Sequence, residues 1–220
     1  MAGPIPRQLL PDNSSVVDER LQIAGCDVLD LAERFGTPLF VYDEEHLRAR
    51  CREAVAAFGN GVAYATKSFL CSAMARLANE EGMHLDVATG GELHVALAAG
   101  VPPDRLVLHG NNKSPVELTT ALEAGVGRIV VDSFDEIDRL ETLHQEGSSA
   151  IRVLVRITPG VEAHTHEYIA TGHDDSKFGF TVSSGAAEAA IDRIRKSPAL
   201  ASMKQRRRNR DRPLRKNARD

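Results

Sequence analysis

A lysine follows a short apolar run in the stretch AYATKSFL, residues 63–70, and could act as a covalent catalyst. A deprotonated lysine amine attacks carbonyl groups, and several enzymes use this reaction to bind a substrate or a cofactor. The neighbours of Lys67 are alanine, threonine and serine rather than other charges. From position alone, however, such a residue is more often a solvated loop lysine. Its role therefore depends on which other groups share its place in the fold.

Several other motifs could have a chemical role, but each has a simpler explanation without one. The glycine pair in DVATGGELH, residues 86–94, could present backbone N–H groups to an anion, but a tight turn before a helix also needs glycine. HGNNKS, residues 109–114, lacks the spacing of a phosphate-binding loop. His164 and His166 have no further ligands spaced to complete a metal site, so we expect no metal. Cys71 has no identifiable base and reads as a packed thiol.

Apolar runs alternate with alanine-rich helical patterns after a proline-rich opening, with a period of roughly 20 to 25 residues. Strands that are apolar on both faces and joined by helices imply an α/β fold, with a parallel sheet that is either open or closed into a barrel. Several of the helical patterns end in the glycine expected just past a helix. The expected strands span residues 38–43, 61–66, 84–89, 105–110, 128–133 and 151–157, and the expected helices lie between them.

Charged and polar residues gather where these strands end. In parallel α/β folds, ligands bind at the carboxyl ends of the strands, whether the sheet is open or closed. We therefore expect one edge of the sheet to collect Lys67, Asp86, His109, Asp132 and Arg156.

Composition and charge limit the class of protein. The 220 residues are 42% hydrophobic and carry a net charge of −4, which is ordinary for a globular domain. Three cysteines, Cys26, Cys51 and Cys71, read as reduced thiols. The sequence contains no signal-peptide pattern and no run near the roughly 18 apolar residues of a membrane span, so we expect a cytoplasmic protein.

Several strings occur together in an order and spacing typical of one family. They are VAYATKS, LDVATGGEL, HGNNKS, VVDS and RITPGVEAHTHEYIATGHDDSKFGF. From about residue 15 to about residue 200 the sequence resembles diaminopimelate decarboxylases, of the alanine-racemase-like, fold type III group that uses pyridoxal 5'-phosphate. The resemblance implies a (β/α)8 barrel with a second β-domain, a homodimer, and conversion of meso-diaminopimelate to L-lysine with loss of CO2. The HTHEYIATG and GNNKS strings favour this activity over those of the related ornithine and arginine decarboxylases.

The resemblance assigns roles to four residues. Lys67 matches the lysine that carries the cofactor covalently, and its small neighbours leave room for a flat pyridine ring. Such a lysine needs partial desolvation or cationic neighbours to lose its proton. By the same resemblance, Asp86 and Glu92 lie close to the cofactor and Arg156 lies in the barrel mouth.

The sequence also departs from the family. After SPAL, a family member would continue with a strand and a segment of the type GLHCHIGSQ, whereas residues 204–220 hold nine Lys or Arg against two Asp. We expect residues 36–200 to form a partial barrel of the TIM type that lacks its last strands and the C-terminal β-domain. Residues 1–35 would pack on that domain and should be poorly ordered without it. Residues 201–220 should be a basic, disordered tail, and a frameshifted end explains them better than a nucleic-acid-binding arm, because they contain no aromatic residue.

Two classes of function follow. The first is a pyridoxal-phosphate-dependent amino-acid decarboxylase of lysine biosynthesis that acts on a small-molecule substrate, with this shortened chain inactive alone. The second is non-catalytic: a fragment, or a basic-tailed binding protein. An open sheet edge also predicts a marginal or aggregation-prone chain.

Overall fold

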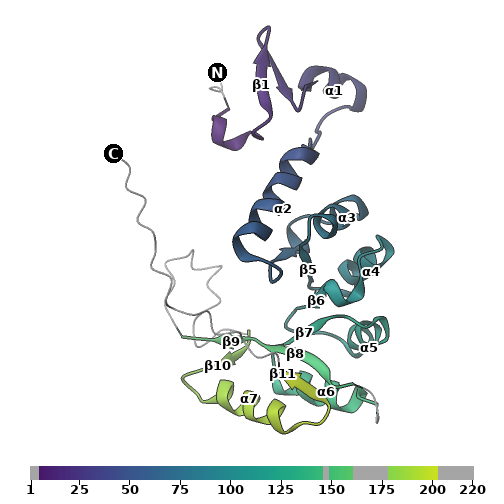
Figure 1. Ribbon diagram of the computed structural model, residues 1–220, viewed down its shortest axis with the longest axis vertical. Coiled ribbons are helices and arrows are strands. Elements are labelled where there is room, and N and C mark those ends of the chain that lie inside the picture. Colours follow the sequence, from purple (N-terminus) through teal and green to yellow (C-terminus); the bar gives the residue numbers. More distant parts are fainter. Residues whose placement is uncertain (1–4, 146–148, 161–177, 203–220) are drawn as a thin grey trace. The chain divides into compact units, whose positions relative to one another are not determined.

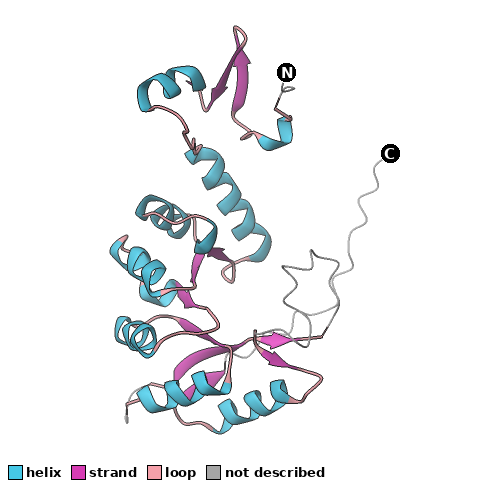
Figure 2. Ribbon diagram, turned by 180° about the vertical axis from the view of Figure 1, so that it is seen from behind, coloured by secondary structure: helices cyan, strands magenta, loops and turns pink. Residues whose placement is uncertain are grey.

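The computed structural model describes residues 5–145, 149–160 and 178–202 (Figure 1). The chain divides into two compact units. Unit 1 comprises residues 1–110 and 120–127, and unit 2 comprises residues 111–119 and 128–220. Helices and strands alternate along most of the described chain (Figure 2).

Unit 1 begins with a small antiparallel sheet. After a short 3-10 helix, Arg7–Leu9, the strands β1 (Ser14–Val17), β2 (Arg20–Ile23) and β3 (Cys26–Asp27) pair in that order. The Asp27 side chain accepts hydrogen bonds from the first turn of α1 (Val28–Phe35), and Arg20 pairs with the same carboxylate at 2.6 Å. Residues 14–35 therefore have regular structure, and the expectation of poor order was wrong for them. A hairpin and a capped helix are stabilised by short-range contacts and need no distant partner.

The rest of unit 1 is a parallel α/β arrangement. Its strands β4, β5 and β6 lie side by side in that order. The apolar residues Leu85, Val87, Leu106 and Leu108 of these strands are fully buried, which is the burial that strands covered by helices require. The elements are α2 (Glu44–Phe58), β4 (Ala63–Ala65), the 3-10 helix η2 (Thr66–Ser68), α3 (Ser72–Glu80), β5 (His84–Val87), α4 (Gly90–Ala98), the 3-10 helix η3 (Pro103–Arg105) and β6 (Leu106–Leu108).

Unit 2 has the same type of structure. Here β8 lies between β7 and β11, and all three strands are parallel. A separate two-stranded parallel sheet joins β9 to β10. The elements are β7 (Arg128–Val131), α6 (Phe134–Leu143), β8 (Ile151–Val155), β9 (Ile157–Thr158), β10 (Phe180–Thr181), α7 (Ala186–Lys196) and β11 (Leu200–Ser202), while α5 (Pro115–Ala124) contains the boundary between the units.

Most of the sequence predictions for these elements are confirmed. The expected α/β class with parallel strands is observed, and five of the six expected strands are present, although most are shorter than predicted. The remaining prediction, a strand at residues 38–43, is wrong: this segment forms no strand, and Phe40 within it is 85% exposed. An apolar run is stable as a strand only when its backbone groups find a neighbouring strand, and the described residues provide none here.

Three helices begin with the same local device. Thr89 and Glu92 form a reciprocal capping box at the start of α4, and Ser114 with Glu117 does the same for α5. At α6, Ser133 accepts from the backbone N–H of Glu136, whose carboxylate accepts from the N–H of Asp132. A capping box satisfies backbone donors that the helix itself leaves unpaired, and each cap is worth about 1 kcal/mol. This repeated [ST]-x-x-E pattern fixes the turn after each of three successive strands.

Gly127 lies where two backbone segments of unit 1 meet. Its N–H donates to Pro103 at 2.9 Å, and a Cβ placed on it would lie 2.1 Å from the Asp104 carbonyl oxygen. We expect Gly127→Ala to lower the free energy of unfolding by about 1 to 3 kcal/mol, because backbone cannot move aside as a side chain can. Urea denaturation measures the loss. Gly61→Ala is the matched control, since a Cβ there meets nothing within 4 Å, and equal effects of the two substitutions would contradict the prediction.

Candidate functional site

Lys67 lies in η2, directly after β4, in a turn that is fixed on both sides. The Thr66 hydroxyl, almost fully buried, donates to the Asp86 carbonyl at 2.9 Å. Ser68 donates to the Ala65 carbonyl at 2.8 Å, and the Tyr64 hydroxyl donates across the turn to the Phe69 carbonyl at 2.7 Å. The Lys67 side chain itself is exposed and has no hydrogen-bond or ion-pair partner among the described residues. The turn therefore holds the backbone rigidly and leaves the amine free to react.

Asp86 lies beside this turn on the neighbouring strand. The register pairs Ala65 of β4 with Asp86 of β5, and Asp86 with Val107 of β6. Because side chains alternate along a strand, these three residues share one face of the sheet. Lys67 and His109 follow two residues after the outer members of this row.

The His109 imidazole and the Asp86 carboxylate form a pair at the same edge. Nδ1 of His109 lies 3.3 Å from Oδ2 of Asp86, and the His109 backbone N–H donates to Val87 at 2.7 Å. The second polar atom of each side chain, Asp86 Oδ1 and His109 Nε2, is buried without a hydrogen-bond partner in the described part of the chain. Buried polar atoms without a partner cost about 1 to 3 kcal/mol each, and such atoms at a strand end point to a ligand that satisfies them.

The carboxylate of Glu92 is engaged with the backbone of the turn that follows β5. Its Oε2 accepts hydrogen bonds from the backbone N–H groups of Ala88 at 2.6 Å and Thr89 at 3.1 Å. The carboxylate thus caps α4 and fixes the turn after β5. Glu92 follows Asp86 closely in the sequence, but its Oε2 is already hydrogen-bonded to the backbone of the turn between them.

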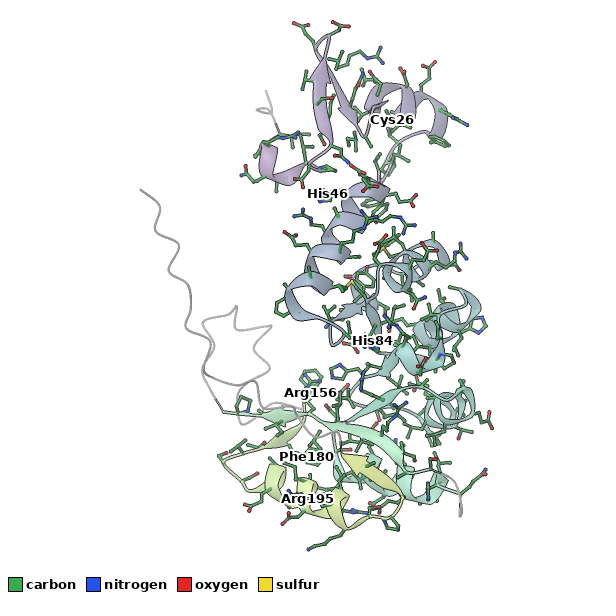
Figure 3. All side chains as sticks on the ribbon, viewed as in Figure 1. Cys26, His46, His84, Arg156, Phe180 and Arg195 are labelled. Atoms are coloured by element: carbon green, nitrogen blue, oxygen red, sulfur yellow. The ribbon has the colours of Figure 1, made fainter. Side chains whose placement is uncertain are left out.

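Arg156 follows β8 in unit 2 and is labelled in Figure 3. Its guanidinium lies 3.4 Å from Oδ1 of Asp132, whose side chain is only 1% exposed, and stacks 4.3 Å from the centre of the Phe178 ring. Its backbone N–H donates to Val131 at 3.0 Å. The carboxylate and the ring fix the direction of the positive charge, so Arg156 is a preorganised cation at the end of its strand.

A buried ion pair between Lys113 and Glu136 contacts Asp132 through a hydrogen bond to its backbone N–H. Nζ of Lys113 lies 2.6 Å from Oε1 of Glu136, and the two side chains are 1% and 5% exposed. The same amine donates to the Val130 carbonyl at 2.8 Å, and the other Glu136 oxygen accepts from the N–H of Asp132. Burial raises the pKa of Glu136, and the nearby charge of Lys113 opposes that rise. Sequence reasoning missed this pair, because no pattern near Lys113 in HGNNKS marks the lysine as buried.

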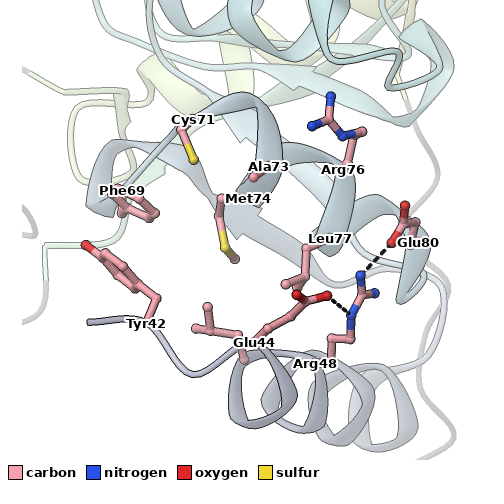
Figure 4. Close-up of a pocket in the computed structure, with 11 residues that line it drawn as sticks. Tyr42, Glu44, Arg48, Phe69, Cys71, Ala73, Met74, Arg76, Leu77 and Glu80 are labelled. Carbon is pink, nitrogen blue, oxygen red and sulfur yellow. Dashed lines mark hydrogen bonds and ion pairs between the residues drawn. The ribbon is translucent and has the colours of Figure 1, made fainter. Parts of the chain in front are cut away.

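A cavity of about 390 Å³ in unit 1 is not lined by any of the four expected site residues (Figure 4). Tyr42 and Phe69 stack along it with ring centres 4.4 Å apart. Arg48 on its other side is engaged with Glu44, at 2.9 Å, and with Glu80, at 2.8 Å. The cavity is therefore separate from the Asp86 edge. Arg48 is already paired, whereas Arg76, which also lines the cavity, has no ion pair among the described residues.

Glu81, close to this cavity, gives a pH-dependent contribution to stability. Hydrogen bonds from Arg52 and then Arg48 lower the pKa of its carboxyl group. A pKa lowered by folding adds stability above the ordinary pKa of glutamate, about 4.3, and this stability is lost as the pH falls through the lower, folded value. We expect the stability difference between the wild type and Glu81→Gln to shrink as the pH falls from about 7 to about 3.

Urea midpoints at several pH values measure that difference. Glu53→Gln is the matched control, because Glu53 pairs with Arg50 in an exposed position, where an ion pair adds little. A difference that stays constant with pH would mean that Glu81 is not held by its arginines.

Residues 5–145, 149–160 and 178–202 contain neither a candidate metal site nor a candidate membrane-spanning helix. In these ranges no group of His, Cys, Asp and Glu could hold a metal ion. None of the helices there is long and apolar enough to cross a membrane. His164 and His166, considered above as metal ligands, lie outside the described residues, as do residues 203–220 of the expected basic tail. The first two residues of that tail, Ala201 and Ser202, belong to β11.

The comparison with protein families decides the assignment. Residues 44–201 match the family model described as "Pyridoxal-dependent decarboxylase, pyridoxal binding domain". The chain belongs to this family. Its matched residues include Lys67 and both strand-end clusters described above.

Relatives of this pyridoxal-binding domain bear the name diaminopimelate decarboxylase. The chain is 57% identical over 191 residues to that of Mycobacterium tuberculosis and 53% identical over 182 residues to that of Bacillus subtilis, covering 86% and 80% of this chain. It covers 42% of each relative, so it spans less than half of their length.

A solved structure agrees. The diaminopimelate decarboxylase of M. jannaschii in co-complex with L-lysine is 33% identical, with a TM-score of 0.77 over 88% of this chain and 46% of that one. The resemblance drawn from the sequence strings is thus confirmed, whereas the roles of Lys67, Asp86, Glu92 and Arg156 stay predictions.

Proposed function

We propose that this chain carries the cofactor-binding part of a decarboxylase that binds pyridoxal 5'-phosphate at Lys67 and converts meso-diaminopimelate to L-lysine and CO2. The observation that carries the proposal is a lysine amine without a hydrogen-bond or ion-pair partner in the described ranges, on a rigid turn beside Asp86, in a chain of the pyridoxal-binding family. The relatives' shared name supports the substrate.

The residues present fit the cofactor. Lys67 supplies an amine that no other described residue pairs with, and its neighbours Ala65 and Ser68 are small. Within the part of the chain that the structure describes, Asp86 Oδ1 is a buried acceptor without a hydrogen-bond partner, as expected where a ligand completes the hydrogen bonding.

In this proposal each residue has a limited task. Pyridoxal phosphate, when bound, accepts the electron pair left by the bond between Cα and the carboxylate. Lys67 attaches the cofactor, and its turn fixes the direction of attachment. Asp86 offers a negative charge and an acceptor at the same strand end. Arg156, held by Asp132, supplies a fixed positive charge that can orient an anionic group.

The partners and the location are proposals of the same kind. We infer a small-molecule amino-acid substrate, a homodimer as the family resemblance implies, and a cytoplasmic location consistent with a biosynthetic enzyme. Neither a nucleic acid nor a membrane is inferred as a partner.

A chimera tests the function. Residues 44–201 would replace the matching segment of the M. tuberculosis enzyme, which 57% identity makes compatible. We expect the chimera to release CO2 from meso-diaminopimelate and its Lys67→Ala form to release none. Release from ornithine or arginine instead would favour the related decarboxylases, and a folded chimera without activity on any of the three would contradict the proposal.

The chain alone tests the non-catalytic alternative. We expect pyridoxal phosphate to label Lys67 weakly, detected by borohydride reduction and peptide mass mapping, with no CO2 released. Robust turnover by the chain alone would show that the residues described here suffice for catalysis.

A further inference from the structure

We propose that His109 is a positioning residue that holds the Asp86 carboxylate in the orientation needed at the Lys67 strand end. This inference rests on the proposed function, because it concerns the same cofactor site. Nothing in the family description or in the relatives' names assigns a role to this histidine.

The backbone fixes both members of the pair before their side chains meet. Asp86 is paired on both sides, with Ala65 and with Val107, and its carbonyl accepts the hydroxyl of Thr66. His109 is anchored through its N–H to Val87, at 2.7 Å. Both side chains therefore start from rigid strand ends, where a positioning role needs them.

The side-chain contact is directional. His109 Nδ1 lies 3.3 Å from Asp86 Oδ2, while Asp86 Oδ1 has no hydrogen-bond partner in the described ranges. A donated hydrogen bond from Nδ1 occupies Oδ2 and stops the carboxylate from rotating, which leaves Oδ1 as a fixed acceptor for the ligand. It also makes Nε2 the unprotonated nitrogen when the ring is neutral.

The alternative is that His109 only fills space. Its side chain is 32% exposed and its Nε2 has no partner in the described ranges, which is unlike a histidine retained for packing. The neighbours Val107 and Leu108 already supply a buried apolar strand, so a packing role would be served by an apolar residue. The pairing with Asp86 is the property that such a residue would lack.

The first measurement needs no cofactor. Nitrogen-15 NMR of the 220-residue chain at about pH 8, where an unperturbed imidazole is neutral, reports which ring nitrogen carries the proton. The His109 signal is identified by its loss in His109→Asn. We expect the Nδ1–H tautomer in the wild type, and a shift towards Nε2–H in Asp86→Asn, whose amide can donate to Nδ1. An Nε2–H tautomer in the wild type, or no response to Asp86→Asn, would overturn the pairing.

The second measurement follows the attachment of pyridoxal phosphate to Lys67. The Asn side-chain amide can take the place of Nδ1, so His109→Asn should label at nearly the wild-type rate, whereas His109→Leu should slow labelling about tenfold, the loss expected for one charged hydrogen bond. If His109 acts through Asp86, His109→Leu has no further effect in the Asp86→Asn background. Wild-type labelling by His109→Leu, or independent effects of the two substitutions, would overturn the proposal.

The two measurements distinguish a failure of this inference from a failure of the proposed function on which it rests. Failure of the wild-type chain to label at Lys67 would count against cofactor binding by this chain, and the tautomer would still decide whether His109 holds Asp86. Denaturation midpoints of the variants identify any loss of labelling that comes from unfolding.

Discussion

Lys113→Met is expected to lower the free energy of unfolding by about 3 to 5 kcal/mol, the usual cost of breaking a buried ion pair from one side. Lys113 and Glu136 are 1% and 5% exposed, so removing the amine leaves the Glu136 carboxylate buried without its counter-charge. The methionine fills a similar volume, and the loss therefore reports charge rather than a cavity. Urea denaturation measures it.

The double variant Lys113→Met, Glu136→Gln separates the two causes. Because it removes both charges, it should recover much of the loss, as buried pairs replaced on both sides often do. Lys196→Met is the control, since Lys196 is exposed at the end of α7. A single variant as stable as this control, or a double variant less stable than the single one, would contradict the prediction.

The loss of stability caused by the single variant Lys113→Met depends on pH in a defined direction. Burial already raises the pKa of Glu136, and removal of Lys113 takes away the charge that opposes this rise. A carboxyl group whose pKa is raised by folding favours the folded state at low pH, and that contribution is lost as the pH rises through the folded pKa. The destabilisation by Lys113→Met should therefore be smaller at about pH 5 than at about pH 8.

Lys67→Ala is expected to abolish the attachment of pyridoxal phosphate without changing stability. The side chain is exposed and makes no hydrogen bond or ion pair with the residues that the structure describes, so its removal should alter the free energy of unfolding by less than about 0.5 kcal/mol. In the proposed function, in contrast, the covalent bond to the cofactor forms with this amine. Borohydride trapping and mass mapping measure the attachment, and urea denaturation measures the stability.

Two further variants sharpen that result. Lys67→Arg keeps the positive charge but has no reactive amine, and it should fail like Lys67→Ala. Lys196→Ala removes an exposed lysine of unit 2 and should label normally. Labelling that persists in Lys67→Ala at the wild-type level would place the cofactor lysine elsewhere.

Local sequence patterns predicted the helices well. The structure adds capping pairs that were not used in the prediction: Thr89 with Glu92, and Ser114 with Glu117, satisfy each other's backbone donors at helix starts. Glycines with positive φ, such as Gly59 and Gly100, follow the predicted helices. These signals depend on neighbours within a few residues, so the sequence contains them in full.

The failures concern pairing between distant segments. Residues 38–43 have the composition of a strand, but they form none, since a strand exists only beside another. The capping of α4 by the Glu92 carboxylate was not foreseen either, while the expected place of Glu92 beside the cofactor stays a prediction. A glutamate can cap a helix or bind a ligand, and only the atoms around it in the folded protein show which contacts it makes.

The sequence by itself determined the α/β rhythm, the family and the place of Lys67 at a strand end, because each follows from short patterns read along the chain. The tertiary structure alone decided that His109 meets Asp86 and that Lys113 is buried against Glu136. Both contacts join residues separated by 23 positions along the chain. Strand register and burial bring them together, and neither property is written in the residues next to them.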